Sequence, residues 1–249
     1  MKIYYILLLI IGFIFLQPPN RVLLENSFCE INFNHFLGCD RLGREISSLY
    51  IYGSLSTLII AIPSKILAII SSLILSFFAI TGGKIINIII NSISSIFLSI
   101  PSLLIALVIV YTLGKSIDIF ILSLVITDWA SSYETIYSKL NEIYKSGYVY
   151  ISKNYGANSI YIFRKHIIRE LFPLLKIIFI TGIPSMIMTI TIYSYLGINF
   201  GSEYFGPGLG EQIAFSKDYF DKSPFSVLMP ILGIFLLVNL FRVYKDKIS

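Results

Sequence analysis

Few residues of this 249-residue chain have the types and spacing that catalysis requires. The run from Leu113 to Ser116 (LGKS) resembles the end of a phosphate-binding loop, but that motif needs a glycine five residues before Gly114, where the chain has Ile109. GxSxG and HExxH motifs are absent, and no apolar segment carries a paired-carboxylate constellation. The sequence therefore predicts no catalytic residue and no cofactor bound by this chain.

The sulfur and imidazole side chains do not form a recognisable metal motif. Cys29 and Cys39 lie close together in the sequence without a CxxC pattern or a Cys/His cluster, so no zinc site is expected. His35 and His166 fall on opposite sides of the membrane in the topology derived below, which excludes a two-histidine site. The two cysteines form a disulfide if their loop faces an oxidising compartment. Otherwise they are two inert thiols, which we favour slightly.

Two ionisable residues, Lys65 and Asp128, lie within strongly apolar segments. Charged groups inside a membrane are costly and usually face a cavity or a partner, although one near the end of a span can reach the interface instead. Asp128 lies about 11 residues into its segment beside Trp129 and is the better functional candidate. We hypothesise that both side chains face the interior of a helical bundle.

The composition indicates a membrane protein. Hydrophobic residues make up 56% of the chain and charged residues only 13%, whereas soluble domains carry about a quarter charged residues. The formal net charge of +5 is consistent with basic cytoplasmic loops rather than with binding to nucleic acid.

Six apolar segments predict six transmembrane helices, because backbone groups in hydrocarbon must be hydrogen-bonded within the segment. They run over residues 2–17, 50–80, 85–113, 117–137, 174–198 and 225–241. The first resembles a signal peptide, but no small-x-small cleavage site follows it, so we interpret it as an uncleaved anchor. The predicted fold class is an all-α integral membrane protein. Residues 1–35 form the anchor and the start of an external loop.

The distribution of basic residues predicts the orientation. With the N-terminus in the cytoplasm, 12 of the 19 Lys and Arg residues lie inside, six lie outside, and Lys65 lies within a span. This bias favours two cytoplasmic termini and places the long loop of about residues 138–173 inside.

That cytoplasmic loop has helical features of its own. Tyr148, Ile151, Tyr155 and Ile162 are spaced to share one helical face, and Gly156 interrupts the pattern as expected for a turn between two short helices. A basic amphipathic element of this kind either lies on anionic lipid or docks on a cytoplasmic partner, and composition alone leaves both open.

Polar residues form three stripes along the predicted spans. Small hydroxyl and amide side chains at such positions serve either as contacts between helices or as the lining of a translocation path. The stripes comprise Asn87, Asn91, Ser94, Ser95, Ser99 and Ser102; Lys65, Ser72 and Ser76; and Thr181, Ser185 and Thr189. For the path, the candidates are Lys65, Asn87, Asn91, Ser99, Asp128, Thr181 and Ser185.

Four segments resemble the C-type permease subunit of ABC importers of the dipeptide, oligopeptide and nickel group. The segment from Phe36 to Leu58 (FLGCDRLGREISSLYIYGSLSTL) is similar to that family's LGTDxLGRDxxSRxxYGxRxSL. The segment from Ser99 to Leu107 (SIPSLLIAL) is similar to FPSLLLAL. Residues 148–167 (YVYISKNYGANSIYIFRKHI) are similar to the YVEAARALGASxxxIxxRHI coupling loop, and residues 208–220 (GLGEQIAFSKDYF) resemble its last external loop.

The resemblance implies a type I importer permease domain over residues 36–249 in a bacterial cytoplasmic membrane. Its partners would be a homologous B-type permease, two cytoplasmic ATPase subunits that use ATP and Mg²⁺, an extracytoplasmic solute-binding protein and membrane lipid. The ATPase-coupling residues carried over are Lys153, Tyr155, Gly156, Ala157, Asn158, Arg164, Lys165 and His166. Nothing in the resemblance involves nucleic acid or a reaction performed by this chain.

The coupling loop departs from the family pattern at two places. Tyr150-Ile151-Ser152 stands where the family has Glu-Ala-Ala, and Arg169 replaces the closing proline. Both departures bear on how the loop binds its ATPase. The substrate stays open between peptides and nickel complexes. A secondary transporter or channel, and a structural membrane protein, are the alternative functions.

Overall fold

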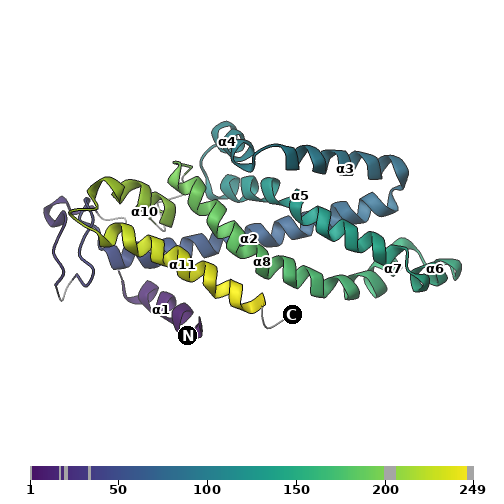
Figure 1. Ribbon diagram of the computed structural model, residues 1–249, viewed down its shortest axis with the longest axis horizontal. Coiled ribbons are helices and arrows are strands. Elements are labelled where there is room, and N and C mark those ends of the chain that lie inside the picture. The colour runs from purple at the N-terminus through teal and green to yellow at the C-terminus, as the bar shows by residue number, and fades with distance from the viewer. Residues whose placement is uncertain (1, 17, 20–21, 33–34, 199–205, 246–249) are drawn as a thin grey trace.

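The computed structural model describes residues 2–16, 18–19, 22–32, 35–198 and 206–245. The described chain is helical, and its one β-bridge pairs Cys39 with Glu45. Figure 1 shows the elements in order: α1 (Lys2–Phe15), η1 (Leu24–Asn26), α2 (Ile46–Thr81), α3 (Gly83–Ser99), α4 (Ser102–Leu113), α5 (Ile117–Tyr144), α6 (Gly147–Asn154), α7 (Ser159–Ile162), η2 (Phe163–Ile167, a π-turn), α8 (Ile168–Tyr195), α10 (Leu209–Ser216), η3 (Lys217–Tyr219) and α11 (Phe225–Lys245).

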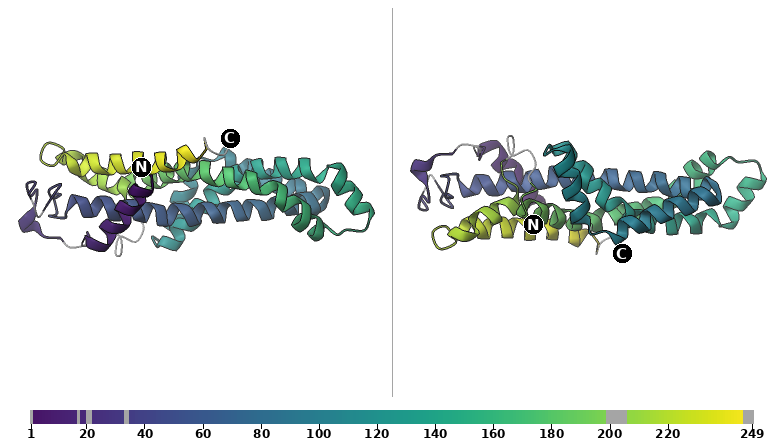
Figure 2. Two further views of the ribbon diagram at one scale, coloured as in Figure 1. Left: turned by 90° about the horizontal axis from the view of Figure 1, so that it is seen from below. Right: turned by 90° about the horizontal axis from the view of Figure 1, so that it is seen from above.

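Three long helices, α2, α5 and α8, form the centre of an elongated bundle (Figures 1 and 2). Helix α2 has 36 residues and is therefore about 54 Å long, well beyond the about 30 Å of a hydrocarbon core. One end of the bundle carries α6 and α7, and the other carries α10 and the segment that precedes α2 (Figure 1). The two ends are therefore separated by the full length of the central helices.

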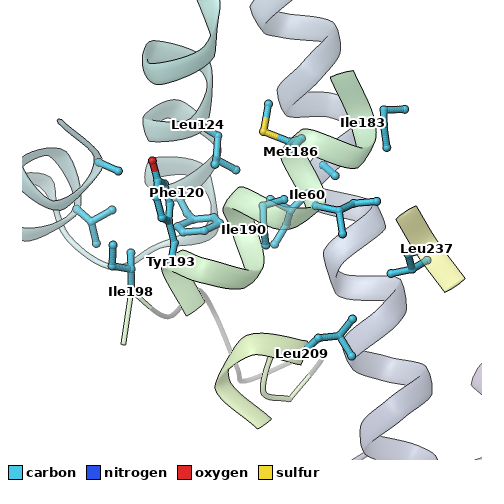
Figure 3. Packing of buried hydrophobic residues seen from close by; sticks show 14 of the residues in the cluster. Ile60, Phe120, Leu124, Ile183, Met186, Ile190, Tyr193, Ile198, Leu209 and Leu237 are labelled. Carbon is cyan, nitrogen blue, oxygen red and sulfur yellow. The ribbon is translucent and has the colours of Figure 1, made fainter. Parts of the chain in front are cut away.

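The main core lies where α2, α4, α5, α8 and α11 converge (Figure 3). Ile60, Phe120 and Ile187 are fully or almost fully buried there. Gly210 allows α10 to approach α8 closely, because a Cβ at this position would lie 2.0 Å from the Thr191 carbonyl oxygen. Such small residues at helix contacts are typical of packing in membranes, where close approach replaces the hydrophobic effect.

All six predicted apolar segments are helical, but the third is not one helix. Between α3 and α4 the chain bends by 94°. Ile100 is extended (φ −93°, ψ 131°) because it precedes Pro101, and α4 starts directly after the proline. The expectation of one helix over 85–113 was therefore wrong, because Pro101 ends the first helix and starts a second one.

Two helical stretches of the described chain are long and apolar enough to cross a membrane, Ile46–Thr81 and Ser159–Tyr195. The α3 and α4 pair would provide a third if it forms one broken span. A shorter apolar helix covers Phe225–Phe241, and α5 interrupts its apolar sequence with Asp128 and Glu134.

Candidate coupling and translocation sites

The turn between α6 and α7 is built around Gly156, as the sequence predicted. Gly156 has φ +83°, a conformation that L side chains rarely adopt, while the space around its Cα is open. Its N–H donates to the Lys153 carbonyl oxygen at 2.9 Å, and the Ala157 N–H donates to that of Ser152 at 3.0 Å. Asn158 then starts α7, because its Oδ1 accepts from the Tyr161 N–H at 2.8 Å.

A surface groove of about 590 Å³ opens at this turn. Six of the eight predicted coupling residues line it: Tyr155, Gly156, Ala157, Asn158, Lys165 and His166. Arg164 lines a second hollow on the adjoining side of α7. Lys153 instead turns back, with its Nζ 3.5 Å from the centre of the Tyr144 ring. The structure therefore brings most of the predicted set into one concave surface.

The short helices that carry the groove are packed against the long helices. Leu140 of α5, Val149 of α6, Ile162 of α7 and Leu171 of α8 are all fully buried in one hydrophobic cluster. The short helices are therefore packed against the adjoining ends of α5 and α8 rather than suspended between them. A force applied to the groove would act directly on α5 and α8.

Polar contacts add to this attachment. The Tyr148 hydroxyl donates to Glu170 Oε1 at 2.6 Å, and burial together with this hydrogen bond raises the pKa of Tyr148. The His166 ring lies 5.7 Å from the Tyr148 ring and 6.4 Å from the Tyr161 ring. Lys165 Nζ donates to the Tyr161 hydroxyl at 2.8 Å. The aromatic residues thus hold the basic side chains at the edge of the groove.

The prediction that Tyr148, Ile151, Tyr155 and Ile162 share one helical face was wrong. Ile162 is fully buried, whereas Tyr155 is 89% exposed and Ile151 is 56% exposed. The Gly156 turn changes the chain direction between them, so a spacing counted through the turn does not describe one helix. The result is a buried anchor at Ile162 and an exposed apolar surface at Ile151 and Tyr155.

Lys65 and Asp128 meet inside the bundle. Lys65 Nζ lies 2.6 Å from Asp128 Oδ2 and donates to Ser132 Oγ at 3.1 Å. The Lys65 side chain is 5% exposed and that of Asp128 is 24% exposed. Gly182 of α8 makes room for the lysine, since a Cβ there would lie 2.1 Å from Lys65 Cε. One charged pair thereby joins α2, α5 and α8.

The polar stripe of α3 is mostly a contact with α5. Asn87 Nδ2 donates to the Tyr137 hydroxyl at 2.7 Å, and the Tyr133 hydroxyl donates to Asn91 Oδ1 at 3.0 Å. Ser94 Oγ donates to Glu134 Oε1 at 3.0 Å. Ser99 is exposed and donates to the Ile96 carbonyl oxygen of its own helix. Asn87 and Asn91 therefore hold helices together, as expected for interhelical hydrogen bonds.

Further exposed polar positions lie on α8 and α5. Thr181 and Ser185 are exposed on α8, and the Thr181 hydroxyl donates to the Ile177 carbonyl oxygen. Helix α5 carries an exposed polar strip that was not among the three stripes predicted from the sequence. It consists of Ser131, Glu134 and Thr135. Its spacing of i, i+3 and i+4 was the available signal. Asp128 lies one turn before this strip and is partly exposed.

At the opposite end of the bundle, Cys29 and Cys39 form a disulfide, so our slight preference for free thiols was wrong. Asp40, within the LGCDRLGR motif, accepts from the backbone N–H groups of Leu42 and Arg44 and forms an ion pair with the Arg44 guanidinium at 2.7 Å. The Arg41 guanidinium lies over the Phe215 and Tyr219 rings. The motif thus folds a loop that packs against the segment after α8.

The described part of the chain is thus a helical bundle with a charged pair in its interior and, at one end, a groove whose helices pack on α5 and α8. The comparisons identify the family. Residues 75–248 match the model of the binding-protein-dependent transport system inner membrane component, and the chain belongs to this family. It is accordingly a permease subunit of an ABC importer in the inner membrane, a transport component rather than an enzyme.

Two relatives and one solved structure illustrate the relationship. The metal-staphylopine import system permease protein CntC of Staphylococcus aureus (strain Mu50) is 24% identical over 93% of this chain and 79% of its own length. The dipeptide transport system permease protein DppC of Alkalihalophilus pseudofirmus is 24% identical over 96% and 81%.

A chain of the MetNI methionine ABC transporter, solved in inward-facing conformations, superposes with a TM-score of 0.65. It has 19% identity and covers 80% of this chain and 94% of its own length. At this level of identity the superposition supports the fold alone.

Proposed function

We propose that the α6–α7 surface is the site at which an ATPase subunit drives this permease. The observation that carries the proposal is the groove at Gly156, built from exposed Tyr155 and Ile151 and fixed to α5 and α8 by the buried cluster at Ile162. Movement of a bound ATPase would move α5 and α8 directly, because the short helices are packed against them. ATP and Mg²⁺ would be bound by the partner, and this chain would hold neither.

The chain would cross the membrane six times with both termini in the cytoplasm. The spans would be α1, α2, the broken α3–α4 pair, α5, α8 and α11, in keeping with the excess of basic residues on the inner side. The permease would pair with a homologous B-type subunit, and an extracytoplasmic binding protein would deliver the substrate at the end that carries the disulfide. Rocking of the two permeases would then alternate access.

We propose a peptide or a metal complex such as a nickel chelate as the substrate. The two relatives described above are named for a dipeptide and for a metal complex, so the similarity supports this class without choosing within it. The path would run beside the Lys65–Asp128 pair and the exposed hydroxyls of Thr181 and Ser185, with Asn87, Asn91 and Ser99 along α3. Packing against α5 makes Asn87 and Asn91 supporting residues.

Gly156→Trp tests the coupling proposal. We expect substrate uptake to fall at least tenfold while the amount of protein in the membrane is unchanged, because tryptophan both disfavours the positive φ and fills the groove. Uptake of labelled substrate and ATP hydrolysis by the assembled complex would be measured together. Hydrolysis that no longer depends on substrate would indicate uncoupling.

Gly83→Trp is the matched control. Gly83 also has a positive φ (+87°) and open space around its Cα, but it lies in the turn between α2 and α3. Backbone strain alone would affect both variants equally. The proposal is contradicted if Gly156→Trp transports normally, or if both variants lose uptake to the same degree.

A further inference from the structure

Three metal-ligating side chains converge at the end of the bundle opposite the groove. The ligand atoms of Cys29, His35 and Cys39 all lie within 4.8 Å of one another. Among the described residues, His35 Nδ1 is buried without a hydrogen-bond partner. Buried polar atoms normally have hydrogen-bond partners, so this nitrogen is free to act as a ligand in a ring that lies beside both sulfur atoms.

The backbone of this loop is held in place by contacts other than the disulfide. The Cys39 N–H donates to the Cys29 carbonyl oxygen at 3.2 Å, and the Gly38 N–H donates to that of His35 at 3.1 Å. Gly38 permits this approach, because a Cβ there would lie 2.8 Å from the Cys29 carbonyl oxygen. The Ser223 hydroxyl, just before α11, donates to the Cys39 carbonyl oxygen at 3.2 Å. The three side chains would therefore stay together after the sulfur–sulfur bond is cleaved.

We propose that reduction of the Cys29–Cys39 disulfide creates a binding site for a zinc-like divalent cation, with the two thiolates and His35 Nδ1 as ligands. Zn–S distances of about 2.3 Å and Zn–N distances of about 2.0 Å place tetrahedral ligand atoms about 3.3–3.8 Å apart. The histidine already lies within about 1.5 Å of that separation. The two sulfur atoms must move apart by rotation about their side-chain bonds.

The ligand set selects the class of metal. Two thiolates with one imidazole suit zinc and similar borderline-soft ions, whereas calcium and magnesium require oxygen ligands. Three protein ligands leave the fourth tetrahedral position for water. The site lies in the loop that packs against the segment after α8, far from the groove, and it is independent of the proposed coupling role.

The metal site would form in two steps, reduction of the disulfide and then binding of the cation. A dithiol or phosphine reductant supplies two electrons, and the disulfide takes up two protons and becomes two thiols while the reductant is oxidised. The cation then binds both sulfur atoms and releases the two thiol protons to solvent, with no further electron transfer. His35 binds as neutral imidazole through Nδ1 and keeps its proton on Nε2. The disulfide and the metal are therefore mutually exclusive ways of closing one loop.

Cobalt(II) binding to the full-length protein in lipid nanodiscs tests the proposal. The protein is reduced with a phosphine, the reductant is removed without oxygen, and Co²⁺ is titrated while the thiolate-to-cobalt charge-transfer band is recorded. The chain has only two cysteines, so any such band comes from this pair. We expect one Co²⁺ per chain, displacement of Co²⁺ by Zn²⁺, and no band in the oxidised protein.

Substitution of each histidine separates a built site from two free thiols. His35→Ala should weaken Co²⁺ binding at least tenfold, whereas His166→Ala, at the other end of the molecule, should leave it unchanged. Circular dichroism and size-exclusion elution of each sample would establish that it is folded. A folded, reduced wild-type protein with two titratable thiols and no cobalt band would overturn the proposal, as would equal binding by wild type and His35→Ala. Neither outcome bears on transport.

Discussion

At the scale of single residues, the Lys65–Asp128 pair is the clearest case of a costly group with a specific partner. An unpaired charge inside a bundle carries a large desolvation penalty, which the pair offsets through an ion pair at 2.6 Å and a hydrogen bond to Ser132. Gly182 is part of the same arrangement, because any larger residue would displace the lysine stem. The position of both charges within apolar segments identified them from the sequence, but nothing in the sequence identified the glycine.

Removing one member of the pair should be worse than removing both. We expect Asp128→Asn to destabilise the protein by about 3 kcal/mol, because it leaves the buried Lys65 ammonium without its counter-ion. Lys65→Met alone should cost less, because the Asp128 side chain that it leaves unpaired is 24% exposed. The double variant should recover most of that loss. Thermal unfolding of the four proteins in one detergent would measure the coupling. Additive losses in the double variant would show that the two residues do not act as a pair.

At the scale of elements, the short helices show how one residue decides the use of a segment. Gly156 divides the cytoplasmic loop into α6 and α7, so that Val149 and Ile162 are buried while Ile151 and Tyr155 are exposed. If the same apolar residues lay on one straight helix, they would form a single hydrophobic face suited to lipid. Because the chain turns at Gly156, some of them are buried against the long helices and others line a separate concave surface. This arrangement favours docking of a partner over a purely lipid-bound role.

Helix α10 carries a partly buried carboxyl group whose effect on stability depends on pH. Burial raises the pKa of Glu211 above its ordinary value of 4.5, and Arg44 opposes this only in part. The folded protein therefore binds the proton more tightly than the unfolded chain. Ionisation of Glu211 therefore lowers the free energy of unfolding. The loss is complete above the folded-state pKa, and stability is regained as the pH falls through that pKa towards 4.5.

Glu211→Gln tests this effect. The glutamine side chain does not titrate, so the variant should be more stable than wild type at pH 7.5 and should lose that advantage as the pH approaches 4.5. Melting temperatures of both proteins across this range give the difference directly. A difference that stays constant with pH would contradict the assignment to Glu211.

At the scale of the whole molecule, the length of α2 separates the two ends of the bundle (Figure 1). The groove at α6 and α7 lies at one end. The disulfide loop and α10 lie at the other, joined to each other through Arg41, Phe215 and Tyr219. Force delivered at the first end reaches the second only through long, continuous helices, which suits a protein that alternates access across a membrane.

This arrangement predicts opposite accessibility of the two ends in intact cells. In a Cys29→Ser, Cys39→Ser background, Lys217→Cys should react with a membrane-impermeant maleimide from outside, because it is exposed beside α10. Lys153→Cys should react only after the cells are permeabilised. The degree of labelling with and without permeabilisation is the measurement. Labelling of both positions from outside would contradict the proposed orientation.

Much of this architecture follows from the sequence, because hydrocarbon imposes one strong constraint. Apolar runs must be helices in a membrane, so all six predicted segments are helical, and Gly156 signals its turn locally. The break at Pro101 was visible as a proline but not as a 94° bend, since the angle depends on how α4 packs against α5. The local sequence therefore predicts which residues form helices, whereas the packing of the helices sets the angles between them.

The sequence by itself determined the helical segments, the uneven distribution of basic residues and the turn at Gly156, since these depend on composition and on local spacing. Only the tertiary structure decided which distant residues meet. It paired Lys65 with Asp128 across a space left by Gly182, turned Asn87 and Asn91 towards α5, and brought His35 beside two bonded cysteines. Such contacts depend on helix rotation and loop path, which are set by the packing of the whole bundle and leave no periodic signal in the chain.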